Sequence, residues 1–271
     1  YTNEITLSTT GVNTDKLNEL EHFADGFAER VTKYSVLQFH RILDKISEIP
    51  PNYKAWNLGL ASGLACCGFT FLLGGGPVEM ILAFFGAGVG MYVRKKLLER
   101  HITLLANVAA GVAAACCTYL LLFKLFEVIF NVSSVHQSGY ICSMLFVIPG
   151  FPLITGGIDL AKLDLRSGLE RITYALLIIL MATITGWVVA LLLHFSPADF
   201  PELEMAPLLK MVIRIITSFC GVYGFSLMFN SKRKMAACAG LIGMIANTTR
   251  LELIDFTPIP AGVAAFIGAM I

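Results

Sequence analysis

Long apolar runs fill most of the chain after residue 54 and alternate with short polar connections. The runs span 55–75, 77–93, 102–123, 140–158, 172–195, 207–230, 234–248 and 258–271. A helix needs about 20 mostly apolar residues to cross the hydrocarbon core of a bilayer. Because the runs have this length or come close to it, the pattern predicts an all-α, polytopic membrane protein with about eight transmembrane helices in this chain.

Lysine and arginine gather in every second connection. They lie before the first run and after the second, fourth and sixth, including Lys54, Arg94, Lys95, Lys96, Arg100, Lys162, Arg166, Arg171, Lys232, Arg233 and Lys234. The alternate connections contain none, except for Arg250 before the last run. Because cytoplasmic loops carry the excess of Lys and Arg, the alternation predicts a multi-pass protein of the cytoplasmic (inner) membrane with a cytoplasmic N-terminus.

Residues 14–49, which precede the first run, have a different pattern. Apolar side chains recur at helical spacing among charges, at Leu17, Leu20, Phe23, Phe27, Val31 and Tyr34. This periodicity predicts one N-terminal cytoplasmic amphipathic helix, which Pro50 and Pro51 end. The helix could pack on a cytoplasmic domain or lie on the membrane surface, and its charges of mixed sign favour packing. We expect residues 1–54 to be the remainder of a larger cytoplasmic domain.

The composition agrees with a membrane protein and argues against several functional classes. Charged residues make up 14% of the chain, the mean hydropathy is +0.73 and the net charge is +1, which argues against nucleic acid as a partner. The pairs Cys66–Cys67 and Cys116–Cys117 lie in apolar runs and lack CxxC spacing, so we expect them to be buried. The sequence has no metal-like His or Cys spacing and no HExxH, GxSxG or Walker A motif. It therefore predicts no metal, no cofactor and no enzyme activity.

A stretch rich in proline and glycine interrupts the fourth apolar run. Proline removes a backbone donor and clashes with the preceding helical turn. In hydrocarbon, a broken helix is tolerated only where it is buried in protein or lines a water-filled cavity, and transporters place binding sites at such breaks. The stretch therefore predicts a substrate pathway whose backbone binds the substrate, with candidate residues Pro149, Gly150, Pro152, Thr155, Gly156 and Gly157.

Two charged residues near the ends of apolar runs are further candidates for binding. Asp159 follows the break, and an acid near hydrocarbon must be paired or hydrated. It could bind a coupling proton, a cation or a substrate ammonium group, or it could be an interface residue paired with Lys162. Lys124 could bind a substrate carboxylate, or it could pair with Glu127 and extend to the membrane interface.

The sixth and second runs each add a charged position. Arg214 lies four residues after Lys210, so both fall on one helix face, where they could attract an anionic substrate group or extend to the outer headgroups. Glu79 follows Pro77 in the first turn of the second run. An acid is favourable at the positive end of a helix, so we expect Glu79 to have a structural role.

The motif around the break resembles that of the threonine/serine exporter family, which includes a split-chain succinate exporter branch. The matching residues are Pro149, Gly150, Pro152, Asp159, Leu160, Asp164, Gly168 and Arg171. The resemblance implies a cytoplasmic N-terminal domain and two five-helix halves, fused or on separate chains. It also implies export of threonine and serine, or of succinate, driven by the proton gradient.

Five helices in each half would make an inverted repeat, because after an odd number of spans the second half would enter the membrane from the opposite side. On this basis 1–54 is a cytoplasmic helical region, 55–195 the first membrane half and 196–271 the incomplete start of the second. We expect the chain to be truncated, and a second copy or a partner subunit to supply the missing helices.

These patterns favour a proton-coupled secondary exporter whose partners are a small amino acid or dicarboxylate, protons and the lipid bilayer. The alternative is a passive channel for small organic solutes, in which Asp159 only sets the charge selectivity. A membrane enzyme is disfavoured because the sequence offers no nucleophile–base set.

Overall fold

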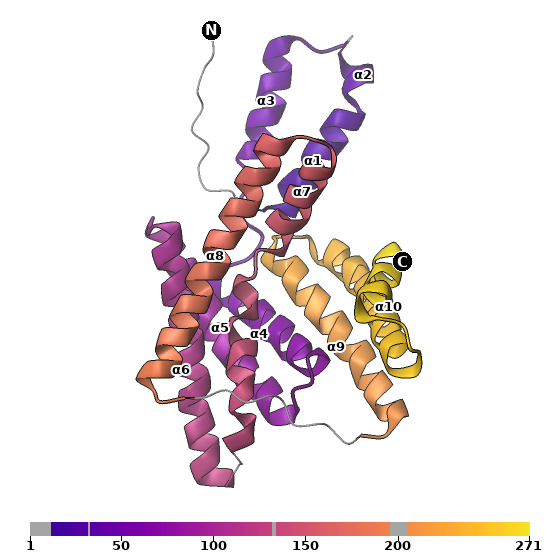
Figure 1. Cartoon of the computed structure of the whole chain (residues 1–271). Coiled ribbons are helices and arrows are strands. Elements are labelled where there is room, and N and C mark those ends of the chain that lie inside the picture. The colour runs from indigo at the N-terminus through magenta and orange to yellow at the C-terminus, as the bar shows by residue number, and fades with distance from the viewer. Residues whose placement is uncertain (1–11, 32, 132–133, 196–204) are drawn as a thin grey trace.

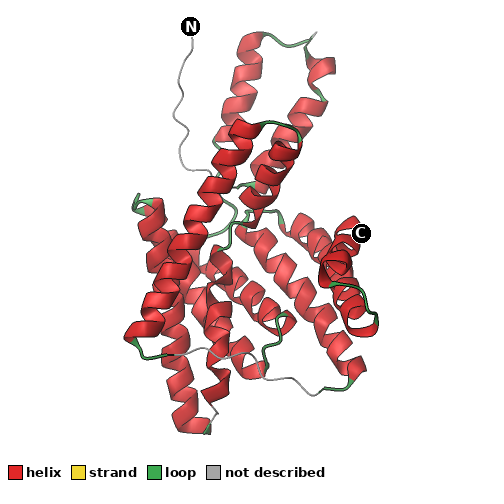
Figure 2. Ribbon diagram, viewed as in Figure 1, coloured by secondary structure: helices red, strands yellow, loops and turns green. Residues whose placement is uncertain are grey.

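A computed structural model describes residues 12–31, 33–131, 134–195 and 205–271, with the backbone alone for 134–138. These residues form helices joined by short connections, and none of them lies in a strand (Figures 1 and 2). The all-α class predicted from the sequence is therefore confirmed. The part of the N-terminal region that precedes residue 12 lies outside the described residues.

The N-terminal region forms three helices in place of the single one predicted. They are α1 (Thr14–Asp25), α2 (Phe27–Arg30) and α3 (Val36–Ser47). Gly26 ends α1, with its N–H donating to the carbonyl of His22. Ser35 starts α3, and the side chain of Gln38 accepts from the Ser35 N–H at 2.7 Å, as in a capping box.

Aromatic contacts hold the first and third helices together. Phe23 and Phe27 lie on the first side of the hairpin, Phe39 on the other, and Tyr34 just before α3. The ring centroids of Phe27 and Phe39 are 5.1 Å apart, and those of Phe23 and Phe39 are 5.8 Å apart. The apolar side chains of this region therefore do recur at helical spacing, but they pack the two sides of a helical hairpin against each other (Figure 1).

Five helices are long and apolar enough to cross a membrane. They are α4 (Ala55–Leu72), α5 (Pro77–Glu99), α6 (Leu104–Phe130), α8 (Leu165–Leu192) and α9 (Pro207–Met228). A 3₁₀ helix, η1 (Ser134–Val147), leads into α7 (Gly150–Ala161), and this bent pair would make a sixth span. The multi-pass prediction is confirmed at this coarser level.

The last two predicted spans, 234–248 and 258–271, are helical, but neither is among the helices that are long and apolar enough to cross a membrane. The first is α10 (Arg233–Phe256), which contains five charged residues: Arg233, Lys234, Arg250, Glu252 and Asp255. The second is α11 (Ala261–Met270), which has 10 residues and so rises only about 15 Å. The count of eight and the inverted repeat remain predictions.

Small residues let α4 pack at close range against its neighbours. A Cβ placed on Gly59 would lie 2.9 Å from the carbonyl of Gly88 in α5. A Cβ on Gly68 would lie 2.5 Å from the carbonyl of Thr217 in α9. Such close approach is typical of membrane helices, whose association depends on van der Waals packing. Through these contacts α4 joins the first helices of the bundle to the α9–α11 group.

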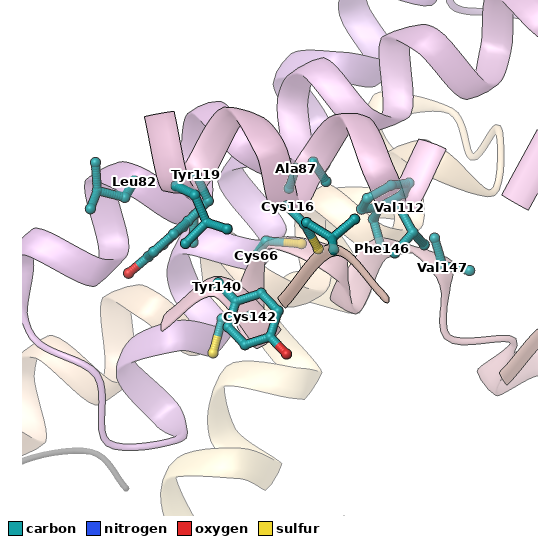
Figure 3. Close-up of a cluster of buried hydrophobic side chains, with 14 of the residues drawn as sticks. Cys66, Leu82, Ala87, Val112, Cys116, Tyr119, Tyr140, Cys142, Phe146 and Val147 are labelled. Atoms are coloured by element: carbon teal, nitrogen blue, oxygen red, sulfur yellow. The ribbon is translucent and has the colours of Figure 1, made fainter. Parts of the chain in front are cut away.

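The buried core surrounds η1, which packs against α4, α5, α6 and α8. Its side chains Tyr140, Cys142 and Phe146 lie among those of the neighbouring helices (Figure 3). The cysteine prediction is correct for Cys66 and Cys116, which are buried, whereas Cys117 is exposed and Cys67 half-buried. Adjacent residues of a helix point in different directions, so only one member of each pair can face the core.

The two ends of the bundle differ in charge. We call the end at which α5, α7 and α9 finish the basic end, because it carries the Lys- and Arg-rich connections. The N-terminal hairpin projects from this end, and α6 and α8 finish at the opposite end (Figure 1).

Candidate functional site

The break between η1 and α7 has a defined local geometry. The two helices meet at 60°, and Ile148 and Pro149 connect them. The Gly150 N–H donates to the Ile148 carbonyl at 2.9 Å, which closes a tight turn at the corner. Pro152 sits in the first turn of α7, where a missing N–H costs nothing because it has no intrahelical partner. The two prolines therefore end one helix and start the next.

The helix after the break packs on the start of α8. A Cβ on Gly156 would lie 3.2 Å from the Gly168 carbonyl, so the two backbones almost touch. Beside this contact, Arg171 Nη1 lies 2.7 Å from Asp159 Oδ2. The partner of Asp159 is thus Arg171 across the hairpin, and the exposed Lys162 caps the end of α7.

The other side of α7 is uncovered. A Cβ added to Gly150 or Gly157 would meet no heavy atom within 4 Å, and Ile154 is 67% exposed. The hydroxyl of Thr155 donates to the Phe151 carbonyl at 2.9 Å and so is used within the helix. The predicted residues of the break are therefore divided between two faces of α7: Gly156 packs on α8 beside Asp159 and Arg171, whereas Gly150 and Gly157 lie on the uncovered face.

Lys124 lies elsewhere, in a surface cavity of about 280 Å³ at the opposite end of the bundle. The cavity is mostly apolar and is lined by Cys117, Leu120, Leu121, Phe123, Lys124, Glu127, Leu193 and Phe195. The predicted pair of Lys124 with Glu127 does not form in the described structure, although both residues line this cavity. Arg171 and Leu193 are 22 positions apart on α8, which places the cavity roughly 33 Å from Asp159 along that helix.

Arg214 is already matched by two acids. Its Nη1 lies 3.0 Å from Glu252 Oε1 and 2.8 Å from Asp255 Oδ2, both on α10. Lys210 pairs with the same Asp255 at 2.7 Å. Arg214 is only 7% exposed, so this network stabilises the contact between α9 and α10. The structure does not bring Lys124 or Arg214 to the break.

Neutral polar contacts join the N-terminal region to residues 229–232, the connection between α9 and α10. Thr14 donates its N–H to the carbonyl of Phe229 at 3.0 Å. Asn52 donates its N–H to Asn230 Oδ1 at 2.8 Å. We call this set of contacts the clasp.

Charged contacts complete the clasp. Lys232 Nζ lies 3.0 Å from Asp15 Oδ1 and 3.1 Å from Glu19 Oε1. Burial raises the pKa of Asp15, but hydrogen bonds from Asn52 and Lys232 outweigh it and hold that pKa below its usual value. The hydrogen bond with Asp15 correspondingly raises the pKa of Lys232. No motif in the sequence pointed to this contact between segments about 215 residues apart.

The structure gives two charged residues a larger place than the sequence indicated. Arg171 was noted only as a basic residue of a connection and as part of the family motif. Glu79 caps its helix as expected, since it accepts from the Gly76 N–H at 3.0 Å, but it also has no exposed surface. The run of apolar residues around Glu79 was the available signal for that burial.

Comparisons with known proteins place the chain in a family. The profile of the family described as "Putative threonine/serine exporter" matches residues 1–194. The curated protein "Probable succinate transporter subunit YjjP" of Escherichia coli K12 is 30% identical over 182 residues, which is 67% of each chain. The protein of the same name from Klebsiella aerogenes is 30% identical over 187 residues, 68% of each chain.

A more distant match comes from yeast, and the chain covers only a small part of it. "Pheromone-regulated membrane protein 10" of Debaryomyces hansenii is 24% identical over 195 residues, which is 66% of this chain and 18% of that protein. No solved structure gave a significant match. The profile covers most of the chain, and the bacterial relatives cover two thirds of it. The chain therefore belongs to the threonine/serine exporter family.

Proposed function

We propose that the chain is part of a secondary active exporter for small amino acids such as threonine and serine, or for small carboxylates such as succinate. Its family and the names of its bacterial relatives support these substrates. The observation that carries the proposal is the 60° break at Pro149 within an apolar segment. Breaks of this kind give a substrate access to backbone groups and helix ends in other transporters.

The ion pair at the end of α7 suits a substrate that carries both charges. Asp159 would bind the ammonium group of an amino acid, and Arg171 would bind its carboxylate through the two parallel bonds that a guanidinium can donate. On the other face of α7, Gly150 and Gly157 leave the backbone open, so the pathway would continue along that face. A substrate that carries a carboxylate but no ammonium group would bind Arg171 in the same way. Its carboxylate would compete with Asp159 for the Arg171 guanidinium.

The cavity around Lys124 supports an exit at the opposite end of the bundle. Lys124 and Glu127 offer one charge of each sign above an apolar floor. Arg214 would meet a substrate carboxylate only in a state in which Glu252 and Asp255 have moved away. The substrate would then pass from the basic end to the opposite end by alternating access.

A second chain or a second copy would complete the pathway. The face of α7 that carries Gly150 and Gly157 is uncovered, and apolar residues such as Ile154 and Ile158 flank it. The two bacterial relatives are each named as a transporter subunit. We place the basic end in the cytoplasm, following the distribution of Lys and Arg, and the energy source is the proton gradient.

The test is efflux of radiolabelled L-threonine and of succinate from vesicles loaded with each. Pro149→Ala should slow efflux because it places a helix-forming residue at the break. Asp159→Asn should slow efflux of the amino acid because it removes the charge that would bind the ammonium group. Glu170→Gln is the matched control, since it changes an exposed acid next to Arg171. Wild-type efflux in both site variants would remove the break from the mechanism, and a lack of trans-stimulation would identify a pore.

A further inference from the structure

Arg94 lies inside a membrane helix and not in the connection that follows it. The apolar run ends at residue 93, but α5 continues to Glu99, so Arg94 belongs to the last turns of the helix. Its side chain is partly buried, and none of the ion pairs formed by the described residues includes it. Arg171 and Arg214, in contrast, are each matched by an acid. A charged residue within a membrane helix is costly without a partner, and such residues commonly mark ion or substrate pathways.

The packing of α5 on η1 places Arg94 at the level of the break. A Cβ on Gly86 would lie 2.9 Å from Ser143 Cβ, and one on Gly90 would lie 2.8 Å from Cζ of Phe146, which Figure 3 shows in the core. Four residues of an α-helix rise about 6 Å, and so do three residues of a 3₁₀ helix. The next position on the same face of α5 is Arg94, and the next corresponding step along η1 reaches the break.

Asn107 lies on the face of α6 that packs against Arg94, and it has an unused acceptor. A Cβ on Gly111 would lie 3.2 Å from Arg94 Cβ. Asn107 precedes Gly111 by four positions, so the two residues share a face of α6. Asn107 is only 1% exposed, and its Oδ1 accepts no hydrogen bond from any described residue. Buried polar groups normally have partners, and a ligand that donates a hydrogen bond would supply this one.

Extension to the lipid headgroups is the usual role of an arginine near the end of a membrane helix. The neighbours of Arg94 favour a different role. Its stem packs on Gly111, which lies seven positions, or about 10 Å, inside α6. Tyr174 of α8 is close enough to Arg94 to interact with it electrostatically, and Tyr174 itself packs against the buried core. The surroundings of Arg94 therefore come from α6 and α8, within the bundle.

We infer that Arg94 and Asn107 form an inner binding site for an α-amino carboxylate at the level of the break. Arg94 donates two parallel hydrogen bonds to the carboxylate, and Asn107 Oδ1 accepts from the ammonium group. The substrate arrives from Asp159 and Arg171 along the uncovered face of α7, because Gly150 leaves the backbone open beside the break. Gly150 and Asp159 are nine positions apart, roughly 14 Å, so one small substrate occupies the two sites in turn. This inference rests on the proposed exporter and adds a second, deeper site to its pathway.

The test matches each side chain with the group that it binds. The probes are L-threonine, L-threoninamide, which lacks the carboxylate, and succinate, which lacks the ammonium group. Calorimetry measures their affinities for the purified, complete transporter. Arg94→Gln should weaken binding of L-threonine by about tenfold or more, as for a lost hydrogen bond to a charged group, and leave that of L-threoninamide unchanged. Arg94→Lys should restore part of the affinity, because it keeps the charge but loses the planar fork. Asn107→Ala should weaken binding of L-threonine but not of succinate.

Lys96→Gln is the matched control, since it removes an exposed cation two positions further along the same helix and should change none of the affinities. Unchanged binding of L-threonine in Arg94→Gln, with efflux intact in the wild type, would overturn the inference and leave the exporter in place. Equal losses for L-threonine and L-threoninamide would also overturn it, because they would give Arg94 a purely structural role. A wild-type protein that binds L-threonine through Arg94, but releases none from loaded vesicles, would instead overturn the proposed function and leave the inner site in place.

Discussion

At the scale of single residues, Asp15 shows how the clasp depends on charge. Its carboxylate accepts from Asn52 at 2.9 Å and lies 3.0 Å from Lys232 Nζ, although its side chain is only 4% exposed. A buried acid of this kind is stabilised by its partners and becomes costly once they are lost. Asp15 is therefore the buried charged residue of α1 through which the clasp contacts the connection between α9 and α10.

We predict that Asp15→Ala loosens the clasp. Hydrogen–deuterium exchange of α1 should accelerate by about tenfold, the size of effect expected for a lost hydrogen bond to a charged group. Asp25→Ala, at the exposed end of the same helix, should change exchange little. Equal effects of the two substitutions would show that the charge at Asp15 contributes nothing specific.

The same contact gives a pH dependence of defined sign. The pKa of Asp15 in the folded chain lies below its unfolded value, so the stabilisation is complete above about pH 4 and is lost as the pH falls through the folded pKa. Protection of α1 in the wild type should therefore be constant near neutral pH and fall in acid. The Asp15→Ala variant should lack this acid transition.

Residue-scale chemistry was only partly predictable from sequence. Asp159 could be picked out because it is an acid beside a helix break. Its partner could not, because the pairing with Arg171 depends on how α7 and α8 align across the turn between them. The sequence suggested Lys162, which lies closer along the chain. Arg214 shows the same limit, because its acids lie 38 and 41 positions further along the chain. Such pairings are set by packing, which a linear pattern does not record.

At the scale of elements, proline marks the start of two spans, whereas α8 begins at Leu165, seven residues before the apolar run predicted at 172–195. Pro77 and Pro207 begin α5 and α9, at positions where proline suits a helix start. The 3₁₀ form of η1 had no sequence signal, because its apolar pattern also fits an α-helix. The N-terminal hairpin did have one: Gly26, and Ser35 with Gln38 three residues later, mark a helix end and a helix start.

The hairpin of α7 and α8 gives an element-scale prediction with an internal control. A Cβ on Gly156 would lie 2.9 Å from Ile172 Cγ1, so Gly156→Ala should push α7 away from α8 and cost about 1–2 kcal/mol. Gly157→Ala meets open space and should be neutral or slightly stabilising. Thermal unfolding and exchange of α7 measure the difference. Equal behaviour of the two variants would contradict the tight packing at Gly156.

At the scale of the whole molecule, Lys and Arg predominate in the connections at the basic end, whereas the described charges at the opposite end are of both signs, as in the pair of Lys210 with Asp255. The clasp fixes the N-terminal hairpin to the basic end, and the break in the η1–α7 pair turns α7 toward the same end (Figure 1). The positively charged end of a membrane protein faces the cytoplasm. Substrate binding beside Asp159 would then occur on the cytoplasmic side of the membrane.

This sidedness can be measured with single cysteines in a chain whose seven native cysteines have been replaced. Glu48→Cys follows α3 at the basic end, and Leu73→Cys lies at the opposite end, where Leu73 is 54% exposed. A membrane-impermeant maleimide should label position 73 in intact cells and position 48 only after permeabilisation. The reverse pattern would place the N-terminal hairpin outside the cell. Asp159 would then face the exterior, and the direction of transport proposed from this geometry would be inverted.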